Sequence, residues 1–294
     1  MIATRICIVL LVIIFLVLVR SCYENRNFTV TNYTYSTDKL NDNIRILMIA
    51  DLHNVVFGRD NAGLYKAIEE KCPDMIIIAG DVLVCNKNQK HPGEKTLSFI
   101  NSLSDIAPVF YGMGNHEYGA MQKMYGVEEL WSEYTDSLDK RINLLDNESA
   151  KIKIKNSVIS IHGLTLDRTY FTRFKKKKLD MEYIYDRLGA FDEGFNILIA
   201  HNPDYFEEYS DTGADIVLSG HNHGGVMRLP LFGGVISPRG RVFPRYDCGR
   251  FDRNSTTLFL TRGLGSHSLR IRFNNMPEVV VIDISCKGNR NNII

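Results

Sequence analysis

Cysteine is sparse in this 294-residue chain and follows no recognisable pattern. The spacing of the six cysteines fits neither a structural metal site nor a disulfide framework, although a bridge among the last four stays open. They stand at Cys7, Cys22, Cys72, Cys85, Cys248 and Cys286. Internal repeats are absent as well, which excludes a solenoid. The fold must therefore be held by an ordinary hydrophobic core.

An excess of charge of one sign is also missing. The 35 Lys and Arg residues nearly balance the 34 Asp and Glu residues, and the formal net charge is +1. This balance argues against a general nucleic-acid binder, so we expect no nucleic-acid partner. Hydrophobic residues make up 45% of the chain, which is enough for one core of α/β size. None of these features indicates an oligomeric state.

Long apolar runs are limited to one, at residues 6–19 between Arg5 and Arg20. As a helix it would span roughly 21 Å, less than the roughly 30 Å hydrocarbon core of a bilayer, and residues 1–4 could extend it. We predict an uncleaved transmembrane signal anchor over residues 1–20. A cleaved signal peptide is the second interpretation, although no small-x-small cleavage site follows the run. A lipoprotein attached through Cys22 is the third.

Each of these interpretations places the protein at a membrane or beyond it. The terminal amino group and Arg5 on one side of the run nearly balance Arg20 and Arg26 on the other, so the positive-inside rule does not fix the orientation. The signal-like position and length favour export. We therefore expect a single-pass protein of the cell membrane with an extracytoplasmic catalytic domain.

Three further segments follow the anchor. Residues 21–43 are polar, rich in Asn, Thr, Ser and Tyr, and predict an extended linker. Residues 44–286 predict a single catalytic domain, and residues 287–294 a C-terminal tail.

Five short clusters of metal-binding residue types recur along the predicted domain, each directly after a short apolar run. The runs are rich in Ile and Val, which is typical of strands buried on both faces. Ligands bind at the carboxyl ends of such strands in layered α/β proteins, so we expect the clusters to converge. The clusters are Asp51-Leu52-His53, Gly80-Asp81, Gly114-Asn115-His116-Glu117, His201 and Gly220-His221-Asn222-His223-Gly224-Gly225.

The residue types in these clusters suit two divalent cations. Two neighbouring ions need a shared carboxylate, for which Asp81 is our candidate, and together they can activate a water and clamp a phosphoryl group during in-line displacement. Mixed carboxylate, imidazole and amide ligands favour manganese, zinc or iron. Because Asp51 and Asp81 are the only anionic ligands, the pocket would keep a positive charge that attracts phosphate.

The order and spacing of the five clusters resemble the calcineurin-like metallophosphoesterases, over residues 44–285. The resemblance implies a four-layer α/β/β/α sandwich, in which two packed mixed sheets are flanked by helices. It also implies attack by a metal-bridging hydroxide, with His116 as the general acid that protonates the leaving oxygen. The implied ligands are Asp51, His53 and His223 for one ion, Asn115, His201 and His221 for the other, and Asp81 as the bridge.

One departure from the family pattern separates this chain from the protein Ser/Thr phosphatases. In that branch the Gly-Asp motif continues to a second Asp and an Arg, whereas Val84 and Cys85 stand here. The departure argues against protein phosphatase activity. It also leaves open which group orients His116, for which Glu117 and a backbone carbonyl are the candidates.

The segment 119–139 follows His116 and contains Met124, Tyr125 and Trp131. We expect an amphipathic helix packed on the core, and the alternative is a wall of the active site that receives an acyl chain or a base.

The C-terminal motifs resemble the membrane-associated branch typified by the YkuE and YaeI phosphodiesterases. These motifs surround Arg262, Arg270 and Arg272, which could bind phosphate or pair within the core. The branch is associated with cleaving UDP-diacylglucosamine or related lipid-linked diesters, so we expect a phosphodiesterase or pyrophosphatase acting on a lipid-linked substrate. A phosphomonoester or a nucleotide on the same site is the alternative. A non-catalytic scaffold is more distant, because it predicts a missing ligand and none is missing. Substrate-binding residues are not indicated.

Overall fold

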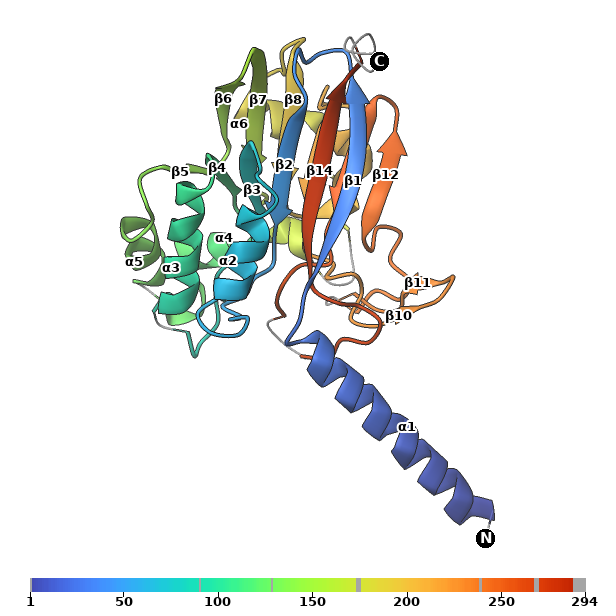
Figure 1. The fold of residues 1–294 in the computed structure, drawn as a ribbon. Coiled ribbons are helices and arrows are strands. Elements are labelled where there is room, and N and C mark those ends of the chain that lie inside the picture. The colour runs from blue at the N-terminus through green and yellow to red at the C-terminus, as the bar shows by residue number, and fades with distance from the viewer. Residues whose placement is uncertain are drawn as a thin grey trace.

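Two six-stranded mixed sheets pack face to face and carry helices on their outer faces (Figure 1). The computed structural model describes residues 2–89, 91–127, 129–172, 176–237, 240–266 and 270–287. The first sheet has the order β1-β14-β2-β3-β4-β5 and the second β12-β13-β9-β8-β7-β6. The strands of the first sheet are β1 Thr29–Thr37, β14 Glu278–Cys286, β2 Ile44–Ile49, β3 Met75–Ala79, β4 Val109–Gly112 and β5 Ile142–Leu145. Those of the second are β12 Gly249–Arg253, β13 Thr256–Leu260, β9 Ile216–Ser219, β8 Phe195–Ala200, β7 Ser157–Leu164 and β6 Glu148–Ile154.

The apolar runs form strands because both of their faces are buried. In β2, Ile46 and Met48 pack between the two sheets, whereas Leu47 and Ile49 pack toward the outer helices. Alternate side chains of a strand point to opposite faces, so an uninterrupted apolar run satisfies two cores at once.

Helices cover the outer face of each sheet. The first sheet packs against α2 to α5, and the second against α6 and α7, through two outer clusters of apolar side chains. The helices are α1 Ile2–Glu24, α2 Ala62–Glu69, α3 Glu94–Ser102, α4 Asn115–Met121, α5 Leu130–Asp136, α6 Met181–Leu188 and α7 Phe206–Tyr209. The 3-10 turns are η1 Leu103–Asp105, η2 Met124–Gly126, η3 Arg168–Phe171 and η4 Pro203–Tyr205, and a small hairpin pairs β10 Arg228–Leu229 with β11 Gly233–Gly234. The predicted four-layer architecture is confirmed.

Strand direction brings the five clusters to one end of the molecule. In the first sheet β2, β3 and β4 are parallel, and in the second β8 and β9 are parallel. The clusters follow the carboxyl ends of these five strands. The site is therefore built from loops of both sheets.

The prediction of an extended linker over residues 21–43 is wrong. Helix α1 continues through Glu24, and β1 pairs in parallel with β14 from Thr29 to Thr37. Thr and Tyr alternate along this segment, and they favour strands when they can pack on a neighbour. The polar composition reflects an edge strand with one solvated side.

The structure describes the predicted anchor at the start of the chain but not the predicted tail at its end. Among the described residues one helix, α1, is long and apolar enough to cross a membrane, with a mean hydropathy of 3.1 over its most apolar window. The predicted C-terminal tail lies outside the described residues beyond position 287. All six cysteines are free, so the bridge left open above does not form.

Gly112 provides a test of the packing between the sheets. A Cβ at this position would overlap Cγ2 of Ile199 on the facing sheet. We expect Gly112→Ala to lower the free energy of unfolding by about 1–3 kcal/mol, because packed layers cannot easily move apart. Chemical denaturation measures the change. The control is Gly63→Ala in α2, where an added Cβ meets nothing within 4 Å. Equal stability of the two variants would contradict this account.

Candidate metal centre and active site

The loops that follow β2 and β3 are joined by backbone hydrogen bonds. The amides of Asp51 and His53 donate to the carbonyls of Gly80 and Asp81 at 2.9 Å and 3.1 Å. Several site residues in these loops and in the loop after β9 have positive φ angles, which residues other than glycine rarely adopt. They are Asp51 (53°), His53 (48°), Asp81 (54°), His221 (72°) and His223 (49°). Backbone strain is thus present where the clusters meet, as is common at functional sites.

Imidazole nitrogens converge on the carboxylates of Asp51 and Asp81. Nε2 of His201 lies 3.1 Å from Oδ2 of Asp81, and Nε2 of His223 lies 3.3 Å from Oδ1 of Asp51. Nε2 of His53 lies 3.7 Å from Asp51 and 3.8 Å from Asp81. Three groups of residues bring their ligand atoms within 4.8 Å of one another: Asp51, His53 and His223; Asp81, His201 and His221; and His53, Asp81 and His116.

Backbone contacts aim the histidines at this centre. Nδ1 of His201 donates to the carbonyl of Ala79 at 2.7 Å, and Nδ1 of His223 donates to that of Gly265 at 2.9 Å. Because a carbonyl can only accept, Nδ1 carries the proton and Nε2 keeps its lone pair for a ligand. The buried Oδ1 of Asn115 has no hydrogen-bond partner among the described residues. These donors fit cations that take mixed nitrogen and oxygen ligands.

The acidic residues and the histidines shift one another's pKa. Burial raises the pKa of Asp51 to about 7. Burial acts in the same direction on Asp81, but the neighbouring His201, His116 and His53 outweigh it and hold that pKa well below its usual range. Burial lowers the pKa of His201, but Asp81 and Asp51 outweigh it and raise that pKa to about 9. The centre therefore holds protons that a cation must displace.

Glu117 is buried and joins the loops that carry Asp81 and Asn115. Its carboxylate accepts hydrogen bonds from five donors at 2.8 to 3.2 Å. The donors are the amides of Asp81, Val82, Leu83 and Gly114 and the hydroxyl of Tyr111. Burial, reinforced by the charge of Asp81, raises the pKa of Glu117. The sequence motif made Glu117 a candidate partner of His116, but the carboxylate instead fixes the backbone of the site.

His116 is held by a group that the sequence did not suggest. The backbone amide of Cys85 donates to Nδ1 of His116 at 2.9 Å. Because Nδ1 accepts, the neutral ring carries its proton on Nε2. The amide of His116 in turn donates to Oδ1 of Asp81 at 2.8 Å. Cys85 occupies the place of the missing Arg, and its backbone amide supplies the orienting contact.

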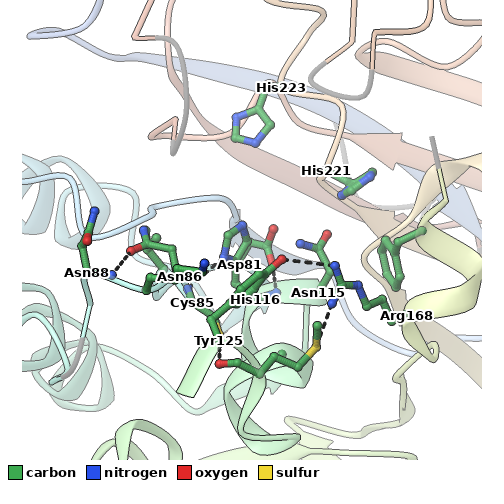
Figure 2. Close-up of a pocket in the computed structure, with 15 residues that line it drawn as sticks. Asp81, Cys85, Asn86, Asn88, Asn115, His116, Tyr125, Arg168, His221 and His223 are labelled. Atoms are coloured by element: carbon green, nitrogen blue, oxygen red, sulfur yellow. Dashed lines mark hydrogen bonds between the residues drawn. The ribbon is translucent and has the colours of Figure 1, made fainter. Parts of the chain in front are cut away.

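A cavity of about 600 Å³ opens onto these residues. Figure 2 shows Asp81, Asn115 and His116 on one wall, with His221 and His223 across the opening. Tyr125 and Arg168 also line it, and Nη2 of Arg168 donates to the hydroxyl of Tyr125 at 3.2 Å. Nothing in the local sequence around Arg168 marked it as part of the site.

The segment 119–139 divides between the two roles considered for it. Met124 and Tyr125 line the cavity, whereas Trp131 packs on the core. The segment is therefore a wall of the site at its start and a core helix at its end.

The C-terminal arginines have structural contacts. The buried guanidinium of Arg272 donates to the carbonyls of Gly265 at 2.8 Å and Asn275 at 3.0 Å. Burial lowers its pKa to about 10. Arg262 forms an ion pair with Glu278 at 2.6 Å. Since Gly265 is also the acceptor of His223, Arg272 supports the loop that aims this histidine.

Comparison with known proteins agrees with this geometry. Residues 44–225 match the family model of the calcineurin-like phosphoesterases, which covers well over half of the chain. The chain belongs to this family. It is therefore a metallophosphoesterase, as the motifs predicted, and the dinuclear centre typical of the family corresponds to a cluster of metal-binding residue types here.

Three relatives of this metallophosphoesterase extend over most of its length. The uncharacterized metallophosphoesterase YkuE of Bacillus subtilis is 26% identical over 250 residues, covering 83% of this chain and 79% of YkuE. The phosphodiesterase YaeI of Escherichia coli is 29% identical over 245 residues, covering 82% of each. The UDP-2,3-diacylglucosamine pyrophosphatase LpxG of Chlamydia trachomatis is 28% identical over 290 residues, covering 81% of this chain and 83% of LpxG. The predicted branch of the family is confirmed.

Replacing the carboxylate of Glu117 tests its role in this metallophosphoesterase. In Glu117→Gln the amide group would face backbone N–H donors, and each buried donor left without a partner costs about 1–3 kcal/mol. We expect a lower free energy of unfolding, measured by chemical denaturation, and weaker metal-dependent activity. Glu133→Gln is the control, because Glu133 lies on the surface beside the exposed His91. Wild-type stability of Glu117→Gln would refute the role assigned to this carboxylate.

Metal uptake is expected to release protons. Starting from metal-free protein at pH 8, His201 with a pKa of about 9 is largely protonated and must lose its proton to bind a cation. Asp51, with a pKa of about 7, contributes more as the pH falls. Affinity should therefore rise with pH between about 6 and 9. Calorimetric titration with Mn²⁺ in two buffers of different ionisation enthalpy measures the release, and identical heats in both buffers would rule it out.

Proposed function

We propose that this metallophosphoesterase hydrolyses a phosphodiester or pyrophosphate bond in a lipid-linked substrate. The observation that carries the proposal is that two groups of metal-binding residue types meet at Asp51 and Asp81, with His116 beside them. A centre of this kind suits in-line displacement at phosphorus.

We assign the candidate ligands to the two sets that the family resemblance implies. Asp51, His53 and His223 would hold one divalent ion, Asn115, His201 and His221 the other, and Asp81 both. When bound, manganese, zinc or iron would supply positive charge for the phosphoryl oxygens and would lower the pKa of the attacking water. The protein's own contribution is to fix these donors: backbone carbonyls hold His201 and His223, and the amide of His221 donates to Asp51 at 3.0 Å.

His116 is proposed to protonate the leaving oxygen. Its Nδ1 accepts a hydrogen bond from the amide of Cys85, so Nε2–H is the ring group available to the leaving oxygen. Full proton transfer requires the cationic ring, whose Nδ1–H would replace the contact with that amide. His116 lines the cavity, and its ring centroid lies 4.9 Å from that of His53. This position sets a proton donor next to the proposed ions.

Three features support a lipid-linked substrate. Two relatives are named as a phosphodiesterase and as a UDP-2,3-diacylglucosamine pyrophosphatase. Helix α1 is apolar and is exposed up to its last turn, which suits a membrane anchor. The cavity combines Met124, Phe171 and Tyr125 with the charged Arg168, and so offers contacts for both an apolar group and a phosphate. We propose a single-pass protein of the cell membrane with an extracytoplasmic catalytic domain and a substrate such as UDP-diacylglucosamine.

Turnover of small phosphoesters tests the reaction. With Mn²⁺, the full-length protein in detergent should hydrolyse bis(p-nitrophenyl) phosphate. We expect Asp81→Asn to abolish activity by removing the shared ligand, and His116→Ala to lower kcat by about 10²- to 10⁴-fold, as for loss of a general acid. His91→Ala is the control, because His91 is exposed and paired with Glu133. Unchanged rates in both site variants would overturn the assignment.

A comparison of substrates separates the diesterase from the alternatives. Rates on p-nitrophenyl phosphate, on a nucleotide and on UDP-diacylglucosamine in mixed micelles should rank the lipid-linked diphosphate first. A clear preference for the phosphomonoester would replace the proposal with a phosphomonoesterase on the same site.

A further inference from the structure

The last turn of helix α1 is fixed to the catalytic domain. The hydroxyl of Ser21 accepts a hydrogen bond from the backbone amide of Arg272 at 3.0 Å. The carboxylate of Glu24 accepts one from the backbone amide of Asn275 at 2.9 Å. Ser21 and Glu24 are buried, whereas the helix before them is exposed. The helix therefore leaves the domain at a defined place, beside the segment 270–275.

The same segment contacts the active site and a small hairpin. The side-chain amide of Asn275 donates to the carbonyl of His223 at 2.7 Å. The amide of Arg228, at the start of β10, donates to the carbonyl of Phe273 at 2.9 Å. Three features thus meet at one short segment: the foot of α1, a residue of the proposed metal centre and the hairpin that follows it. Figure 1 shows α1 and the β10–β11 hairpin at the same end of the sandwich.

The hairpin, which we call the apolar hairpin and define as residues 228–237 and 240–243, exposes large apolar side chains. The most exposed are Leu231 (102%), Phe232 (71%), Val242 (65%) and Phe243 (52%). Outside α1 and this hairpin, the other exposed large hydrophobic side chains among the described residues are Tyr125, Val158 and Tyr185, which lie on separate elements. A group of exposed apolar side chains marks a surface that contacts a partner.

The apolar hairpin is held in a defined shape. Its base is fixed by Asp247, which accepts from the guanidinium of Arg228 at 2.9 Å and from the amide of Gly234 at 2.7 Å. Leu231 and Phe243 have φ angles of 68° and 47°, a conformation that bulky side chains rarely adopt. Strain of this kind persists where the surroundings enforce it. The base from which the exposed side chains project is therefore fixed.

Charged groups lie at the foot of α1. A cavity of about 600 Å³ there is lined by Arg26 and Arg270 together with Leu18, Val55 and Ile271. Basic groups beside apolar ones suit the boundary between lipid head groups and acyl chains.

We propose that the apolar hairpin inserts into the surface of the bilayer that α1 spans. This inference rests on the proposed membrane anchoring. A single spanning helix can tilt in the bilayer, and the domain fixed to it tilts as well, whereas a second contact fixes which face meets the lipid. The hairpin follows His223 directly, so its insertion holds the mouth of the active site against the head groups. A lipid-linked phosphodiester then reaches the site without leaving the bilayer.

Tryptophan fluorescence in vesicles tests the insertion directly. The full-length chain with Trp131→Phe receives Leu231→Trp or Phe232→Trp and is reconstituted into phosphatidylcholine vesicles with brominated acyl chains. We expect bromine to quench both reporters. Val158→Trp is the matched control, since Val158 is also exposed (53%) but lies at the start of β7, the end of the strand away from the site. If Trp131→Phe folds poorly, each reporter tryptophan is introduced into the chain that retains Trp131. The quenching of that chain without a reporter is then subtracted. Equal quenching at the hairpin and at position 158 overturns the proposal, as does quenching that requires association of two chains.

Kinetics separate this inference from the proposed function. The double variant Leu231→Ser and Phe232→Ser should lose about tenfold or more in turnover of UDP-diacylglucosamine in vesicles, because two apolar side chains no longer enter the lipid. Hydrolysis of soluble bis(p-nitrophenyl) phosphate should not change. Equal rates of variant and wild type on the vesicle substrate count against the insertion. Failure of the wild type on every phosphodiester refutes the proposed function, and bromine quenching still decides the position of the hairpin.

Discussion

The carboxylate of Glu117 organises the loops on which the active site depends. Burying a carboxylate is costly, and five hydrogen bonds from the backbone and Tyr111 offset that cost here. Four of these donors belong to the loops after β3 and β4, so one side chain determines how Asp81 and Asn115 face each other. The positive φ of Asp81 persists because this arrangement holds it. The proposed metal binding and proton donation both depend on this fixed backbone.

Electrostatics explains why such rigidity is needed. Asp51 and Asp81 are both buried, and burial of two like charges is unfavourable without a cation. In the metal-free protein, protons on Asp51 and His201 relieve this conflict, as their raised pKa values indicate. The buried carboxylates of these loops therefore favour the binding of a cation. The hydrophobic packing of the two sheets offsets the unfavourable free energy of burying these carboxylates.

The sequence could predict what depends on local pattern and could not predict what depends on distant contacts. Buried strands and the clusters after them were visible because apolar runs and ligand types are local features. The strand β1 was missed, since its polar composition makes sense only beside β14, about 250 residues away in the chain. The contact of His116 with the amide of Cys85 was missed for a similar reason, because a backbone donor leaves no mark on residue identity. Arg168 enters the site from a separate loop, and no spacing rule connects it to the clusters.

The direction in which the site opens is a property of topology. Parallel strands must end together, and here the ends of β2, β3, β8 and β9 meet where α1 leaves the domain. Because β1 runs in parallel with β14 and both run against β2, the chain enters the sandwich at the end where β2 finishes. An anchor placed before β1 is thereby brought to the same end as the site. The edge strand that looked like a linker is thus the element that would turn the active site toward a membrane: an anchor on a flexible tether would leave that orientation free.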